Sequence, residues 1–215
     1  ELADVLSEAE SRKLVVADLM TERQEITANL LRDLLRQPEI LGDLRPGSPS
    51  EPTLLLHSLH YLSKSVAGHP LRRPAWWFDP TEAGPALADV STHLVDLAMW
   101  LLFPGQLVGP DEVVVHAGRT WPTALNAQQF TAITGLTECP PQLRPWVSDG
   151  VLHYQGNGVT DFTTRGVSVR VTVTWAAERE ARDRAEGNTI TVRGTNAVLV
   201  AKSVAALTAA DKPEL

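Results

Sequence analysis

The 215 residues suffice for one large domain, or for one domain with a fragment of a second, and a 43% apolar content is that of a globular chain. The formal net charge of −7 argues against nucleic acid or an anionic membrane surface as a partner, and no apolar run approaches the roughly 18 residues that a membrane span needs. The single cysteine, Cys139, excludes a disulfide within the chain and favours a reducing, cytoplasmic compartment.

The first 40 residues follow a helix–strand–helix pattern. Residues 3–12 predict a short helix, with acidic residues early and basic residues at its end to complement the helix dipole. The continuous apolar run 14–19 has the length of a strand and predicts a buried parallel strand. Thr21 is a typical N-cap residue, so a second helix is expected over residues 22–37. Such an order is typical of an α/β unit.

The next segment contains two histidines. Residues 42–52 are rich in turn formers, and residues 53–67 predict a helix that ends at Gly68. His57 and His60 stand three residues apart on this helix. They either serve as two ligands of a metal that needs further partners, or have a structural or surface role.

Residues 72–104 are the most informative stretch. They open with two arginines and two tryptophans and lead into a long helix on which Asp89, His93 and Asp96 stand at i, i+4 and i+7. At roughly 100° per residue these side chains share one narrow stripe. The other faces are mostly apolar, so the helix is expected to be buried nearly all round. Two carboxylates and a histidine on a buried helix are costly to desolvate unless they are paired or used, which makes them the best functional candidates.

The C-terminal half contains mostly strand signals. A strand is expected over 111–117, an irregular segment over 118–150, and a hairpin of strands 151–155 and 159–164 turning at Gly156-Asn157-Gly158. Residues 167–175 alternate strictly between apolar and polar side chains, and a further hairpin pairs 189–193 with 197–201. Helices followed by antiparallel strands predict an α+β fold, an open-faced antiparallel sheet with helices on one face.

With these segments in order, the chain resembles the C-terminal domain of the glucose–fructose oxidoreductase/inositol dehydrogenase/MocA family. Asp89-Val-Ser-Thr-His93 matches the family's Asp-x-x-x-His pair, and Asp96 follows as in His-x-x-Asp. The Met-Thr-Glu-Arg segment 20–23 and the Arg-Pro-Ala-Trp segment 73–76 are similar to those of a branch of oxidoreductases of this family. The late hairpin with Gly194 matches as well.

Two departures from the family concern its dinucleotide-binding half. No Gly-x-Gly-x-x-Gly turn occurs, and the only Lys-Pro pair, Lys212-Pro213, stands at the wrong end of the chain. We therefore expect residues 1–20 to be a helix–strand remnant of the Rossmann domain and residues 21–215 to be the C-terminal substrate-binding and oligomerisation domain. NAD or NADP is expected in the full-length parent, and no cofactor is expected on this fragment, which should be inactive by itself.

The resemblance implies a site for an alcohol substrate. A histidine can accept a proton near neutral pH, so His93 is expected to be the catalytic base, with Asp89 orienting it or holding the substrate hydroxyl. Asp96 is either a supporting substrate-binding residue or part of a structural hydrogen-bond network. Arg23, Arg73 and Trp76 are expected to bind a carbohydrate-like substrate, because polar and aromatic walls suit sugars. Core packing is the alternative for each tryptophan.

Two other functions stay open. The stripe of Asp89, His93 and Asp96 could serve a metal-dependent hydrolase with His57 or His60, although three ligands in line on one helix fit a tetrahedral metal poorly. The domain could also be a non-catalytic module. A homo-oligomer formed through the open sheet face is expected with either role, with no nucleic acid or membrane partner.

Overall fold

Strands and helices form two layers in this computed structural model, which describes residues 2–16, 20–66, 68–84, 86–179 and 186–203. Seven strands of the described chain form one sheet in the order β4-β6-β7-β1-β8-β9, with β5 paired to β6. The strands are β1 Leu54–Tyr61, β4 Val113–Leu125, β5 Val147–Ser148, β6 Val151–Thr164, β7 Val167–Ala176, β8 Gly187–Arg193 and β9 Val198–Lys202. A small hairpin of β2 Ser65–Val66 and β3 His69–Pro70 stands apart from it.

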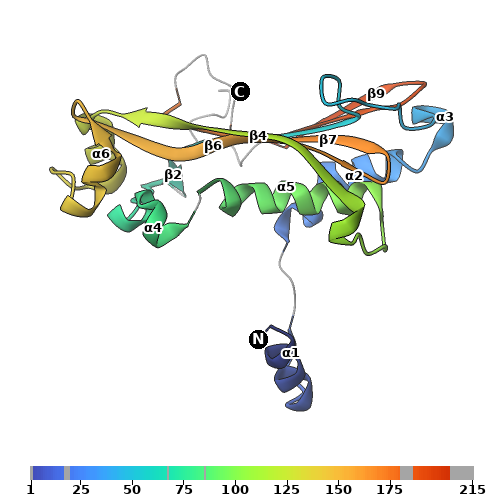
Figure 1. Cartoon of the computed structure of the whole chain (residues 1–215), viewed down its shortest axis with the longest axis horizontal. Helices are drawn as coiled ribbons and strands as arrows, with labels where there is room; N and C mark the ends of the chain where they lie inside the picture. The colour runs from blue at the N-terminus through green and yellow to red at the C-terminus, as the bar shows by residue number, and fades with distance from the viewer. Residues whose placement is uncertain (1, 17–19, 67, 85, 180–185, 204–215) are drawn as a thin grey trace.

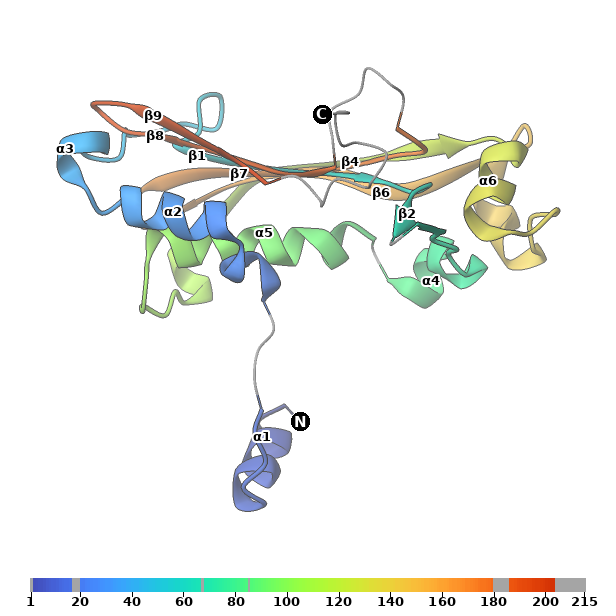
Figure 2. The same ribbon diagram turned by 180° about the vertical axis from the view of Figure 1, so that it is seen from behind.

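The helices cover one face of the sheet, and among the described residues no helix lies over its other face (Figures 1 and 2). The α-helices are α1 Leu2–Ser11, α2 Ile26–Leu34, α3 Pro38–Leu41, α4 Pro80–Ala83, α5 Ala86–Leu102 and α6 Ala127–Thr134. Short 3₁₀ helices are η1 Thr21–Gln24, η2 Ala75–Phe78, η3 Pro110–Glu112 and η4 Pro141–Trp146. The layout confirms the α+β prediction.

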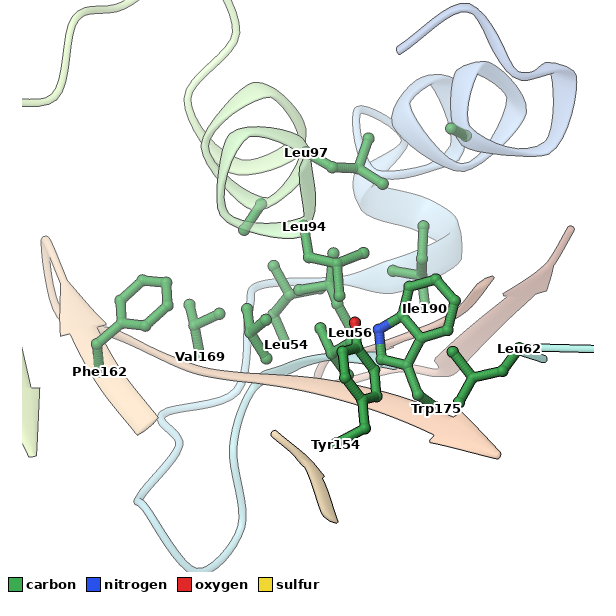
Figure 3. Packing of buried hydrophobic residues seen from close by; sticks show 14 of the residues in the cluster. Leu54, Leu56, Leu62, Leu94, Leu97, Tyr154, Phe162, Val169, Trp175 and Ile190 are labelled. Atoms are coloured by element: carbon green, nitrogen blue, oxygen red, sulfur yellow. The ribbon is translucent and has the colours of Figure 1, made fainter. Parts of the chain in front are cut away.

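The core lies between α5 and the middle of the sheet. Leu94 of α5 lies over Leu54 and Leu56 of β1, with Ile190 of β8 beside them, and Leu97 extends the same cluster along α5; each of these five side chains is buried (Figure 3). Burying a leucine or isoleucine side chain contributes about 1.5–3 kcal/mol, so this row of contacts holds α5 against the sheet.

The prediction of a helix over 53–67 is wrong, because this segment contains β1. Leu54, Leu56 and Ser58 are buried while the residues between them are half-buried, which is the period of a strand. β1 pairs parallel with β7 and antiparallel with β8. A leucine-rich sequence therefore becomes a central strand because neighbours on both sides supply its hydrogen bonds.

The predicted hairpin turn at residues 156–158 is also wrong. β6 runs unbroken through it, and the side chain of Asn157 binds the neighbouring strands instead of making a turn. Its Nδ2 donates to the carbonyl of Trp121 at 3.0 Å, and its Oδ1 accepts from the backbone N–H of Trp175 at 2.6 Å. Nor is segment 118–150 irregular throughout, since it contains the end of β4 and helix α6.

The apolar run at 14–19 does not form the expected strand where it is described. Leu14, Val15 and Val16 have no regular structure and are 60%, 95% and 60% exposed, while residues 17–19 lie outside the described part. The α1 helix before them is confirmed and stands away from the sheet (Figure 1). Residues 22–37 divide into η1, α2 and the residues after it, because the Glu25 side chain, not Thr21, caps α2 by accepting from the N–H of Ala28.

The long helix α5 is confirmed, but it is not buried all round. Leu94, Leu97, Ala98 and Leu101 are buried against the sheet, whereas Asp89 is exposed. Among the described helices, none combines the length and apolarity that a membrane crossing requires.

Candidate functional site

A cavity of about 490 Å³ lies between α5, η1 and the sheet. The described residues that line it come from η1 and α2, β1 and the loop after it, η2, α5, β7 and β8: Glu22, Glu25, Ser58, His60, Lys64, Arg73, Trp77, Asp89, Val90, His93, Leu94, Trp175, Glu186, Gly187, Asn188 and Ser203. A smaller cavity of about 200 Å³ shares four of these residues and extends the same hollow along α2. Segments far apart in the sequence thus meet around one space.

The Met-Thr-Glu-Arg segment is fixed to α5 by two charged contacts. His93 Nδ1 lies 2.9 Å from Glu22 Oε2, an ion-pair distance without the alignment of a hydrogen bond. Arg23 forms a bidentate ion pair with Asp96. Its Nε donates to Asp96 Oδ2 at 2.7 Å, and its Nη2 donates to Asp96 Oδ1. Consecutive residues of η1 therefore pair with residues three apart on α5, because i and i+3 lie on one helix face.

The structure separates the predicted residues into two groups. Asp89, His93 and Arg73 line the cavity together. Arg23 and Asp96 bind each other and are not among its lining residues, so Asp96 belongs to a structural pair. Trp76 is 55% exposed and is not among the lining residues, whereas its neighbour Trp77 lines the cavity.

Arg73 is packed on two tryptophans. Its Cζ lies 4.2 Å from the ring centroid of Trp77 and 5.1 Å from that of Trp175. Burial lowers the pKa of Arg73, while nearby Tyr154, Glu186 and Asp89 raise it by a smaller amount. A guanidinium on aromatic faces gains cation–π attraction and keeps its charge at any physiological pH.

A hydrogen-bonded network on the opposite wall was missed by sequence reasoning. His60 Nε2 lies 2.7 Å from Ser58 Oγ, and His60 Nδ1 lies 3.1 Å from Glu186 Oε1. Lys64 Nζ donates to the same carboxylate oxygen at 2.6 Å. Burial raises the pKa of Glu186, but hydrogen bonds from His60 and Lys64 outweigh it and lower the pKa overall. The helix expected over 53–67 concealed the network, because only a strand places Ser58 and His60 on one face.

Two of the lining residues, Trp77 and Trp175, pack against further rings. Trp175 stacks on His60 at 4.5 Å between ring centroids, and Trp77 stacks on Tyr154 at 4.8 Å. The Tyr154 hydroxyl and Trp175 Nε1 are buried without a hydrogen-bond partner in the described chain, and both are directed toward the α5 side of the sheet (Figure 3). Burial raises the pKa of Tyr154 well above its ordinary value, so its hydroxyl stays protonated.

The geometry does not assemble the metal site left open by the sequence. His57 lies on the other face of β1, where its Nε2 is 2.9 Å from Thr174 Oγ1, and Asp96 is engaged with Arg23. In the part of the chain that the structure describes, no three His, Cys, Asp or Glu side chains converge on one point.

The sequence contains no glycine-rich dinucleotide-binding turn. None of its glycines forms a Gly-x-Gly-x-x-Gly turn, which is the motif that lets a helix N-terminus approach a pyrophosphate. The cavity lining offers a histidine, carboxylates and an arginine, which are side chains that can transfer protons and bind hydroxyl groups.

Comparisons with known proteins agree with this architecture. The family described as "Putative oxidoreductase C terminal domain" matches residues 30–208. The crystal structure of a putative oxidoreductase from Parabacteroides merdae ATCC 43184, at 2.23 Å resolution, is 32% identical with a TM-score of 0.82. The match covers 93% of this chain and 45% of that protein, so the chain spans just under half the length of that relative. The comparison with curated proteins gave no match.

Proposed function

The chain belongs to the family of putative oxidoreductase C-terminal domains, and from that premise we propose that it is the substrate-binding and catalytic-base domain of an NAD(P)-dependent oxidoreductase. The substrate is a sugar or polyol-like alcohol. The finer assignment to the glucose–fructose oxidoreductase/inositol dehydrogenase/MocA family rests on the Asp89-x-x-x-His93 motif and the order of segments. The single observation that carries the proposal is the cavity in which Asp89, His93 and Arg73 meet.

The proton chemistry follows from the position of His93. The Glu22 carboxylate lies 2.9 Å from Nδ1 of His93, so its negative charge favours a proton on that nitrogen, and Nε2 is proposed as the acceptor. Oxidation of an alcohol requires a base for its hydroxyl proton, and a nicotinamide supplies the hydride acceptor in this class of reaction. Asp89, one turn before His93 on α5, accepts a hydrogen bond from a substrate hydroxyl.

The metal-dependent hydrolase is the weaker alternative. Its proposed ligands are divided between two faces of the sheet and a structural ion pair, as described above. By contrast, the proposed proton transfer from an alcohol uses only His93 and Asp89 and does not depend on metal ligands.

The open face of the sheet supports the second role, assembly of several copies. Arg170, Leu55, Thr191 and Val200 are cross-strand neighbours on β7, β1, β8 and β9, and they lie on the face away from the helices. Val200 is 55% exposed and Leu55 is half-buried, so the face offers both apolar and hydrogen-bonding groups. We propose that it forms a homo-oligomer interface.

The test of the oxidoreductase assignment uses the full-length parent protein, NAD or NADP, and a panel of sugars and polyols. His93→Gln and Asp89→Asn are each expected to lower kcat by about 10²–10⁴-fold, the range for losing an acid–base group. Ser91→Ala, between them on α5 and outside the cavity lining, is the matched control and should keep wild-type turnover. Wild-type turnover in both site variants contradicts a catalytic role for the pair.

A further inference from the structure

Arg73 is anchored at the cavity wall before any ligand binds. Its backbone N–H donates to the carbonyl of Ile133 at 3.0 Å, and its guanidinium packs over Trp77 and Trp175. A guanidinium already held by aromatic faces loses little rotamer freedom when it binds a ligand. Its planar fork suits a carboxylate, which can accept two parallel hydrogen bonds from it.

The other charged groups around the cavity are mostly engaged with each other. Glu22 faces His93, Glu186 accepts from Lys64 and His60, and Glu25 caps α2. Among the described residues of the lining, Asp89 has no side-chain hydrogen bond, and the guanidinium of Arg73 donates only from Nε, to the carbonyl of Leu62 at 3.4 Å, so its two Nη groups are available. One can donate to an anion, and the other can accept from hydroxyl groups.

The tryptophans are not free to stack on a sugar ring. Trp77 is covered by Tyr154 and by the Arg73 guanidinium, and Trp175 is covered by His60. Recognition in this cavity therefore depends on its polar groups, since its aromatic surface serves to position Arg73 and His60.

We propose that the cavity takes a polyhydroxy carboxylate, an aldonate- or uronate-like compound, whose carboxylate is bound by the Arg73 fork and whose hydroxyls are bound by Asp89. The inference rests on the proposed function for the idea that the substrate is an alcohol, and adds the acid group. Burial lowers the pKa of Arg73 by more than Tyr154, Glu186 and Asp89 raise it, so a bound carboxylate would add to the compensation that these groups supply.

The experiment is titration calorimetry of the 215-residue chain with three probes. D-gluconate carries both groups, D-glucitol has the hydroxyls without the carboxylate, and acetate has a carboxylate without hydroxyls. Gluconate is expected to bind about 10- to 100-fold more tightly than either, the range for a hydrogen-bonded charged group. Equal binding of gluconate and glucitol overturns the proposal, as does the absence of gluconate binding at about 10 mM, where a millimolar site is filled.

Variants locate the binding on Arg73. Arg73→Gln should weaken gluconate about 10- to 100-fold and leave glucitol unchanged, and Arg73→Lys should restore only part of the loss, because a lysine keeps the charge without the fork. Arg119→Gln is the matched control, since Arg119 packs over Trp121 at 5.1 Å on β4, outside the cavity lining. Unchanged gluconate affinity in a folded Arg73→Gln protein, checked by circular dichroism, overturns the assignment.

The outcomes stay separate from those of the proposed function. Gluconate binding to this chain without NAD(P)-dependent turnover in the parent sinks the oxidoreductase proposal and leaves the acid site standing. If the parent turns over neutral polyols but this chain does not bind gluconate, the acid site is overturned and the oxidoreductase proposal stands.

Discussion

At the scale of single residues, the site is decided by which charged groups find partners. Asp96 is taken by Arg23, and Glu186 by Lys64 and His60, whereas Asp89 stays available at the cavity. The sequence placed Asp89, His93 and Asp96 on one stripe correctly, but helical spacing shows only that side chains share a direction. Which of them meets a partner depends on elements that approach from elsewhere in the chain.

The first prediction at this scale concerns Glu186 and acid. Its pKa is lowered in the folded protein, so it stabilises the fold above its ordinary value of 4.5 and this contribution is lost as the pH falls through the lower folded value. Glu186→Gln is expected to cost about 1–3 kcal/mol of unfolding free energy at pH 7, because Lys64 and His60 lose a charged partner.

The measurement is urea unfolding of both proteins from pH 7 down to pH 3. The wild-type advantage should shrink through the window below 4.5, so that the variant has the flatter acid limb. Glu39→Gln, an exposed carboxylate on α3, serves as the control and should follow the wild type. An advantage of the wild type that is constant with pH contradicts the role given to Glu186.

At the scale of elements, local sequence patterns predicted secondary structure correctly where an element's own periodicity defines it. They failed where pairing with neighbouring strands defines it. α5, β7 and the β8–β9 hairpin match their expected positions because amphipathic or alternating periods run along each of them. The sequence of β1 predicts a helix, since leucines and histidines suit a helix about as well as a strand that is buried by both neighbours. The Gly156–Gly158 segment resembled a turn, but Asn157 binds β4 and β7.

The prediction at this scale concerns the end of β8, where it meets α3. A Cβ added at Gly194 would lie 2.2 Å from the backbone carbonyl oxygen of Leu41, so the backbone has to move to admit it. Gly194→Ala is expected to lower the unfolding free energy by about 1–3 kcal/mol, the usual cost of overpacking. Chemical denaturation measures it.

Gly118→Ala on β4 is the matched control. The nearest atom to its added Cβ is the carbonyl oxygen of Val159 at 3.9 Å, an ordinary contact, so its effect should stay within about 0.5 kcal/mol. Equal effects of the two substitutions would show that the close approach of β8 and α3 is not rigid.

At the scale of the whole molecule, helices cover one face of the sheet, and the described residues place no helix on the other (Figure 2). The α1 helix and the exposed residues 14–16 stand outside this two-layer body, in keeping with the expected division at residue 20, which stays a prediction. The proposed homo-oligomer interface lies on the face of the sheet away from the helices.

The prediction at this scale is that light scattering gives the protein a mass that is a multiple of 23.4 kDa. Val200→Glu, on the exposed edge strand β9, should lower the mass to that of one chain, because a carboxylate buried between copies is costly. Val5→Glu, 61% exposed on α1, leaves the mass unchanged if the interface is the sheet. A wild-type mass of one chain removes the proposal.

Residue order by itself determined the α+β class, the long helix α5 with Asp89 and His93, the alternating strand β7 and the late hairpin, because each depends on periods within one segment. Tertiary structure alone decided that β1 is a central strand, that Arg23 holds Asp96, and that Arg73 lies in the cavity with His60, Glu186 and Trp77. These residues are brought together by strand pairing and by packing between distant segments. Burial of the whole core stabilises such contacts, and no local sequence pattern predicts them.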